Sequence, residues 1–274
     1  MINCFVLFIC ASLILFFHSI ESSSAVNNPR HIFNTLNLTS MSAFNTVVEG
    51  STGLRREPYI VSDKKVYMGL DYFYIPAHYK DVLSSILIPY GAIMDRVEKL
   101  AYDITQDYNG QTIHVLCVLK GASTFFGDLT SAIMKFHNYA RETYIPYTFD
   151  FIRVKSYEGT SSTGNVQISG CDLSSFAGKH VLFVEDIVDT GLTMSRAIDY
   201  LRANCNPKSV RVVSLLEKRT DKSCGFKADY VGFSIPDEFV VGYCLDYNEV
   251  YRDLPHIAVI NQAGIEKFRH FEHA

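Results

Sequence analysis

Apolar and polar positions alternate along most of the chain in a way that predicts strands and helices in turn. Near-continuous apolar runs are typical of strands that helices cover on both faces of a parallel sheet. The strands predicted in this way, together with one alternating run at 147–155, are 113–119, 147–155, 181–186, 210–216, 230–235, 240–245 and 256–260.

Apolar residues spaced three and four apart predict the helices between these strands. After Thr193, four apolar residues fall at i, i+3, i+4 and i+7: Met194, Ala197, Ile198 and Leu201. Further helices are expected at 95–108, before Asn109-Gly110, and at 124–139. This alternation predicts an α/β fold with a mainly parallel, twisted sheet flanked by helices. The late strands lack long helices between them and therefore predict a small appended subregion.

Two segments differ in composition from this pattern. Residues 156–170 contain nine Ser, Thr or Gly residues in fifteen, which is typical of a mobile flap. Residues 4–17 are almost uninterruptedly apolar, are too short to span a bilayer comfortably, and precede small residues at 22–25. That profile resembles a signal peptide without its cationic start.

The cysteines after this leader argue against secretion. There are five, an odd number, and their spacings are irregular: Cys117, Cys171, Cys205, Cys224 and Cys244. We therefore expect a leader at 1–40 that is not part of the fold, a folded domain at 41–274, and a cytoplasmic protein. A secreted form with a working signal peptide is the alternative.

Composition narrows the classes of partner. Hydrophobic residues make up 48%, charged residues 20%, and the net charge is −4, as in an ordinary globular protein. The sequence has no basic stripe of the kind that binds nucleic acids, so nucleic-acid binding is not expected. Membrane binding by the folded domain is not expected either. An anionic substrate would have to be bound by local cations or by a metal ion.

Candidate chemistry is concentrated where the strand at 181–186 meets the following helix. Glu185-Asp186 ends the strand, and Asp189-Thr190-Gly191 forms the turn. Ligands of open α/β sheets bind at this edge, and the free N–H groups of a helix N-terminus suit a phosphate. The segment therefore offers anchors for a sugar and for its phosphate.

Two other interpretations of this segment compete. Asp-Thr-Gly is also the triplet of aspartic proteases, which need two such carboxylates; this chain has one copy, so only a homodimeric protease would fit. An acidic, solvated strand end is the plainer interpretation. The chain has no Gly-x-x-x-x-Gly-Lys-Ser/Thr sequence, so a nucleoside-triphosphatase loop is not indicated.

Residues 184–193 resemble the phosphoribosyl-pyrophosphate motif of type I phosphoribosyltransferases. Blocks at 119–122, 218–220, 239–249 and 252–254 extend this resemblance to the hypoxanthine-guanine phosphoribosyltransferase family, over about 59–260. The resemblance implies the fold of that family, with a base-binding subregion and a flap. It also implies Mg²⁺-dependent transfer of 5-phosphoribosyl from phosphoribosyl pyrophosphate to N9 of a 6-oxopurine, hypoxanthine or guanine, by a homodimer or homotetramer.

The same resemblance assigns the phosphoribosyl-pyrophosphate site. Glu185 and Asp186 would hold the ribose hydroxyls and, with Asp246, Mg²⁺. Asp189 would be the catalytic base. The remaining residues expected to bind the phosphates are Lys120, Gly121, Thr190, Gly191, Leu192, Thr193 and Arg252, and the peptide before Lys120 is often cis in this family. Leu192 departs from the lysine that many relatives carry, which removes a cation beside the phosphates.

On the purine side, the resemblance implies that Lys218 donates to O6, Phe239 stacks on the ring, and Val240 and Asp246 meet the base edge. Ser156 and Tyr157 would close over the site as part of the flap. Simpler roles compete with these assignments. Lys218 could be a surface lysine, Phe239 a core aromatic residue, and Arg252 a partner in a salt bridge. Arg219 is expected to be structural. Rival functions are a nucleotide- or RNA-binding regulator without turnover and a phosphoribosyltransferase for another base.

Overall fold

The computed structural model describes residues 55–64, 68–139, 144–156 and 166–270. The chain divides into two units, 1–46 and 47–274, and every described residue belongs to the second. The predicted boundary between a leader and a folded domain at residue 40 lies outside the described residues, as does Tyr157. Within the described ranges, no helix is both long and apolar enough to cross a bilayer.

A seven-stranded sheet forms the centre of the domain. Its strand order is β1-β8-β7-β6-β3-β4-β5, and every neighbouring pair is parallel except β4 with β5. In chain order the strands are β1 (Tyr59–Ile60), β3 (Ile113–Val118), β4 (Tyr147–Ser156), β5 (Val166–Ser169), β6 (His180–Val188), β7 (Ser209–Lys218) and β8 (Tyr230–Ile235). The mainly parallel sheet predicted from the apolar runs is confirmed.

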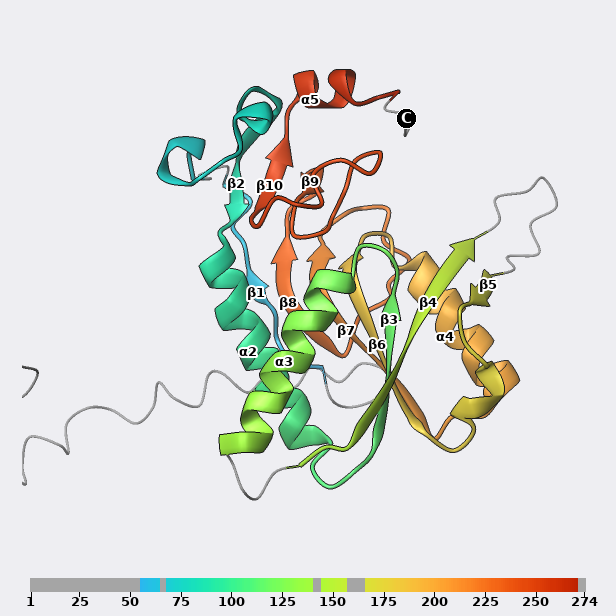
Figure 1. The fold of residues 1–274 in the computed structure, drawn as a ribbon. Helices are drawn as coiled ribbons and strands as arrows, with labels where there is room; N and C mark the ends of the chain where they lie inside the picture. Colours follow the sequence, from blue (N-terminus) through green and yellow to red (C-terminus); the bar gives the residue numbers. More distant parts are fainter. Residues whose placement is uncertain (1–54, 65–67, 140–143, 157–165, 271–274) are drawn as a thin grey trace, which may run out of the picture. The chain divides into compact units, whose positions relative to one another are not determined.

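Helices cover both faces of this sheet. Helices α2 (Tyr90–Asp107) and α3 (Ser123–Tyr139) lie on one face, and α4 (Leu192–Cys205) lies on the other (Figure 1). Successive residues of a strand point to opposite faces. Accordingly, Cys117 of β3 packs into the core beneath α2 and α3, whereas its neighbour Leu116 packs into the core beneath α4.

A second, three-stranded sheet forms the appended subregion. It has the order β2-β10-β9 and is antiparallel. Its own apolar core includes residues of this sheet and of the segments around it. The elements are η4 (Leu70–Tyr72), η5 (Ala77–Val82), β2 (Leu83–Ile88), β9 (Val240–Val241), β10 (Ile257–Ile260) and α5 (Gln262–Lys267), and the 3₁₀ helix η6 (Leu173–Phe176) precedes β6 of the main sheet.

Three expectations from the sequence need correction. The helix expected at 95–108 begins at Tyr90, because Pro89 starts it and Ile93 extends its buried face. The strand expected at 240–245 ends at Val241, because the next residues have positive φ angles that no strand adopts. Part of the segment expected to be a flap, Val166–Ser169, is strand β5 paired with β4. Strands β1 and β2 and helix α5 were not predicted.

Candidate active site

The expected site residues follow the carboxyl ends of three adjacent parallel strands. Lys120-Gly121 comes after β3, Asp189 after β6, and Lys218 is the last residue of β7. Parallel strands in register end at the same edge of a sheet, where ligands of open α/β folds bind. Residues about a hundred positions apart are therefore gathered at one edge.

The turn before α4 borders a hollow at the end of β6. Gly191 has a φ of +79°, and a Cβ at this position would lie 2.7 Å from Cβ of Phe226, so a side chain is excluded on two counts. The backbone N–H of Cys224 donates to the carbonyl of Thr190 at 2.8 Å and holds the turn from outside. A cavity of about 240 Å³ is lined by Val118, Val154, Glu185, Asp186, Ile187, Val188, Asp189, Thr190, Gly191, Thr193 and Met194.

The acidic pair lies on the wall of this cavity. Burial, and then the charge of Asp186, raise the pKa of Glu185 well above its usual value. Gly121 lies against Asp186, since a Cβ on Gly121 would overlap the Asp186 carboxylate. The turn after β3 is thereby brought into contact with the end of β6.

Two adjacent carboxylates, one with a raised pKa, fit a divalent cation that takes oxygen ligands. Among the described residues no group of three or more His, Cys, Asp or Glu side chains could hold a metal ion by itself. Mg²⁺ commonly uses one or two carboxylates and completes its shell with water and substrate phosphates. The pair therefore fits Mg²⁺ with water or substrate phosphates as its remaining ligands.

A cluster of charges lies at the turn after β3. The Leu119–Lys120 peptide is cis, in agreement with what the resemblance implies. Lys120 Nζ is 2.8 Å from Oε2 of Glu249, and Arg252 Nη2 is 2.9 Å from Oδ1 of Asp246 and 3.1 Å from Oε1 of Glu249. The salt-bridge interpretation of Arg252 is confirmed, and two cations, Lys120 and Arg252, lie together on either side of Glu249.

Asp246 differs from its expected position. It was placed at the end of a strand, but it follows a turn with positive φ angles at Gly242, Tyr243 and Cys244. Its Oδ2 accepts a hydrogen bond from the backbone N–H of Glu249 at 2.8 Å. One carboxylate thus stabilises a turn and pairs with Arg252, so a metal ion would have to share it.

The residues expected to bind a purine lie around Lys218. Its Nζ lies 3.3 Å from Oδ2 of Asp189 and 3.8 Å from Oδ1 of Asp237, and only 11% of the side chain is exposed. Phe239 is 48% exposed and meets the ring of Tyr247 edge-on, with 5.5 Å between ring centroids. The core interpretation of Phe239 is therefore wrong, because nearly half of the residue is exposed.

Other expected residues have clear places. Val240 is buried and pairs with Val259 in the small sheet, beside Phe239. Leu192 is 42% exposed at the first position of α4, and Thr193 follows it. Ser156 is the last residue of β4, and residues 157–165 of the expected flap lie outside the described residues.

Arg219 is structural, as expected. Its guanidinium donates to the carbonyl oxygens of Ser234 and Val61, each at 2.6 Å. Sequence reasoning missed Glu249 and Asp237 as neighbours of the expected site. Their positions in the sequence could have indicated them, because Asp237 lies two residues before Phe239 and Glu249 lies three residues before Arg252.

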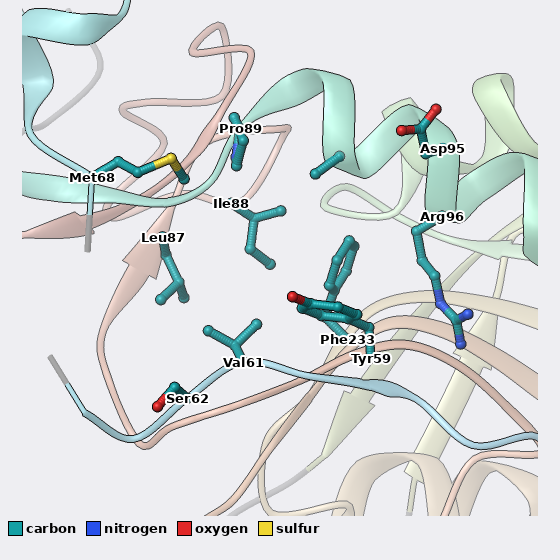
Figure 2. Close-up of a pocket in the computed structure, with 11 residues that line it drawn as sticks. Tyr59, Val61, Ser62, Met68, Leu87, Ile88, Pro89, Asp95, Arg96 and Phe233 are labelled. Atoms are coloured by element: carbon teal, nitrogen blue, oxygen red, sulfur yellow. The ribbon is translucent and has the colours of Figure 1, made fainter. Parts of the chain in front are cut away.

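A larger cavity of about 520 Å³ lies elsewhere, between β1, the end of β2 and α2 (Figure 2). Apolar side chains such as Leu87, Ile88 and Phe233 dominate its wall, and none of the expected site residues lines it. The Arg96 guanidinium beside it donates to backbone carbonyls, including that of Gly232 at 2.8 Å. This cavity offers no free charge for a phosphate and is not the candidate active site.

Comparison with known proteins supports the family suggested by the motifs. The family model for the phosphoribosyl transferase domain matches residues 88–248. The hypoxanthine-guanine phosphoribosyltransferase of Homo sapiens is 51% identical over 211 residues, which cover 77% of this chain and 96% of that protein. The hypoxanthine-guanine-xanthine phosphoribosyltransferase of Plasmodium falciparum is 48% identical over 215 residues, covering 78% of this chain and 92% of that protein.

A solved structure agrees with these sequence matches. The crystal structure of hypoxanthine-guanine phosphoribosyltransferase from Schistosoma mansoni in complex with IMP superposes with a TM-score of 0.65 at 36% identity. The match covers 77% of this chain and 98% of that chain. The sequence matches and the superposition agree with each other. This chain therefore belongs to the hypoxanthine-guanine phosphoribosyltransferase family.

Proposed function

We propose that this protein is a purine-salvage enzyme that transfers 5-phosphoribosyl from phosphoribosyl pyrophosphate to N9 of hypoxanthine or guanine. The products are IMP or GMP and pyrophosphate. The observation that carries the proposal is the 3.3 Å contact between Lys218 and Asp189. It joins a donor suited to a purine oxygen with a carboxylate that lines the hollow before α4.

The phosphoribosyl half of the substrate is held at the end of β6. Glu185 and Asp186 bind the ribose hydroxyls, and the turn of residues 189–193 binds the 5′-phosphate through backbone N–H groups and the Thr190 and Thr193 hydroxyls. Lys120, Gly121 and Arg252 face the pyrophosphate group. Leu192 supplies no cation here. The backbone N–H groups therefore contribute a larger share of phosphate binding than they would if a lysine stood at this position.

The base is held on the opposite side of the hollow. Lys218 donates to O6, Phe239 stacks on the ring, and backbone groups of Val240 and the region of Asp246 meet the ring edge. N9 bonds to C1′ of the ribose as the bond from C1′ to the pyrophosphate oxygen breaks, and pyrophosphate leaves with the electron pair. Asp189 accepts the proton that N7 loses, which is general-base catalysis by a carboxylate within reach.

Mg²⁺ fits the acidic pair and would be held by Glu185 and Asp186 with substrate oxygens and water; Asp246 would be a separate ligand, because the three side chains do not form one cluster. When bound, it neutralises charge on the leaving pyrophosphate. Ser156 and Tyr157 belong to a flap that would cover the site and exclude water, which would otherwise hydrolyse the activated sugar.

Steady-state assays with hypoxanthine, guanine, xanthine and adenine as separate acceptors test the proposal. Release of pyrophosphate with hypoxanthine or guanine is the expected result. Turnover with another base alone would favour a phosphoribosyltransferase of different specificity. Tight nucleotide binding without turnover of any base would favour the regulator, against which the exposed Phe239 and the paired Lys218 and Asp189 argue.

We further propose that the enzyme works in the cytoplasm as a homodimer or homotetramer. All five cysteines after the leader are free thiols, which suits a reducing compartment. N-terminal sequencing of native protein tests the location, since a cut near Ala25 would indicate secretion. Light scattering on the purified protein tests the oligomeric state.

A further inference from the structure

Two cations from distant parts of the chain converge on one carboxylate. Oε2 of Glu249 accepts from Lys120 Nζ at 2.8 Å and from Arg252 Nε at 3.2 Å. Oε1 of Glu249 lies 3.1 Å from Arg252 Nη2. Lys120 follows β3, whereas Arg252 follows β9. The Glu249 side chain thus connects the two cations that face pyrophosphate under the proposed function.

The backbone at Glu249 is unfavourable for a residue with a side chain. Asn248 and Glu249 have φ angles of 51° and 69°, and they form the tip of a turn between Tyr247 and Val250, whose backbone groups pair at 3.2 and 3.1 Å. Two successive left-handed residues are typical of turns with sequences such as Asn-Gly. Glycine would fit the second position more easily. The turn itself therefore does not require glutamate, and its contacts with Lys120 and Arg252 are what the side chain adds.

The carboxylate and both cations remain accessible to a ligand. The side chains of Lys120, Glu249 and Arg252 are 55%, 31% and 22% exposed. Ion pairs at 2.8 and 3.1 Å hold the Glu249 carboxylate between Lys120 and Arg252. Carboxylates and phosphates use the same guanidinium geometry. Glu249 thus stands where an oxygen of an anionic ligand would be bound.

We propose that Glu249 is a positioning residue that competes with pyrophosphate for Lys120 and Arg252. Its carboxylate pairs with both cations, Arg252 sharing a second pair with Asp246; Glu249 yields the two cations to the pyrophosphate group and pairs with them again as pyrophosphate leaves. This inference rests on the proposed function, which places pyrophosphate against these cations. Its consequence is weaker binding and faster exit of pyrophosphate than the two cations alone would give.

Two variants test the competition. Glu249→Gln keeps the shape of the side chain and removes its charge, whereas Glu249→Gly removes the side chain and suits the left-handed backbone. Isothermal titration with pyrophosphate in magnesium buffer should show roughly fivefold tighter binding in both, the scale expected from the loss of two partly exposed ion pairs. Inhibition of turnover by added pyrophosphate should become stronger by a similar factor.

The matched control is Glu98→Gln, which removes the partner of Lys135 at 2.8 Å on the distant surface of α2 and α3. It should leave pyrophosphate affinity unchanged. If wild-type protein turns over hypoxanthine but both Glu249 variants bind pyrophosphate as the wild type does, or more weakly, Glu249 only supports the cations and the inference is overturned. Wild-type protein that neither turns over nor binds pyrophosphate would overturn the proposed function, and this inference with it.

Discussion

Strands β6 and β7 are neighbours in the sheet, and both carry glutamates near their carboxyl ends in opposite electrostatic surroundings. Glu217 on β7 is 4% exposed and is paired with Arg55 at 2.9 Å and Lys227 at 2.8 Å. Glu185 on β6 stands beside Asp186, and within the described part of the chain no ion pair ties either carboxylate to a cation.

The pKa values move in opposite directions as a result. Burial alone would raise the pKa of Glu217, but hydrogen bonds and charges from Arg55 and Lys227 bring it below its usual value. Burial and the charge of Asp186 raise the pKa of Glu185. One carboxylate is paired with cations within the fold, whereas the other stands beside a second carboxylate. The cations around Glu217 therefore suit it to stabilising the fold, whereas the lack of such partners at Glu185 among the described residues is typical of a functional site.

The largest effect should come from Asp189→Asn at the β6 end. The change keeps the shape of the turn and removes the base, so kcat should fall by about 10²–10⁴-fold. Affinity for phosphoribosyl pyrophosphate should change by less than about tenfold. Asp237→Asn is the matched control, because Asp237 also faces Lys218 but lies at 3.8 Å. A kcat within about threefold of wild type would make Asp189 a structural part of the turn.

At the β7 end, Glu217→Gln should reduce stability and spare the chemistry. It leaves Arg55, whose side chain is 15% exposed, without its counter-charge, so the free energy of unfolding should fall by about 3 kcal/mol. Because the folded pKa of Glu217 is lowered, its contribution is present above its usual pKa and is lost as the pH falls through the folded value. Urea unfolding of wild type and variant from pH 7 downward should therefore converge in acid; a constant difference would contradict the ion-pair explanation.

Purine binding should respond to Lys218→Ala and Phe239→Ala in different ways. Loss of the Lys218 donor should weaken the binding of hypoxanthine and guanine by about 1.5–3 kcal/mol, the range typical of hydrogen bonds to charged groups. Loss of the Phe239 ring should weaken any bound purine, because stacking does not depend on the 6-oxo group. Equilibrium titrations of each base measure both effects, and unchanged affinity in Lys218→Ala would show that the base pocket lies elsewhere.

Magnesium should stabilise only the β6 end. Addition of Mg²⁺ should raise Tm by roughly 2–4 °C, equivalent to about 1 kcal/mol for a chain of this size, because a cation relieves the repulsion between Glu185 and Asp186. The double variant Glu185→Gln with Asp186→Asn should lose this response, and Glu217→Gln should keep it. Differential scanning calorimetry with Mg²⁺ and with a chelator measures the shift; an equal response in all three proteins would place the metal elsewhere.

The smallest effect should follow removal of residues 1–40. Neither strand end is expected to depend on them, so a chain beginning at Met41 should keep its turnover and lie within about 0.5 kcal/mol of the full chain in stability. Chemical unfolding and steady-state assays on both chains provide the measurement. Loss of folded, active protein on truncation would refute the expected division at residue 40.

Local pattern was sufficient for much of this protein. The main sheet strands β3, β4, β6, β7 and β8 were predicted because each is a continuous or alternating apolar run, and burial between helices requires that composition. The turn of residues 189–193 was predicted as a phosphate site because strand, Gly turn and helix follow one another directly in the sequence. Strand β1, with two residues, was missed because its pairing with β8 depends on a partner far away in the chain.

What only the tertiary structure decided was which charges meet. The sequence marks Glu185 as a site candidate through the neighbouring Asp186 and the Asp189-Thr190-Gly191 turn, but nothing local shows that Glu217 is paired with two cations. Arg55 reaches Glu217 from 162 positions away, and Lys120 reaches Glu249 across 129. The conformation of a turn is encoded over a few residues, whereas an ion pair forms only when the fold places two charges within about 4 Å of each other. The sequence could therefore predict the edge of the sheet that holds the site, but the three-dimensional fold determined which of its charges are already paired and which are left for a ligand.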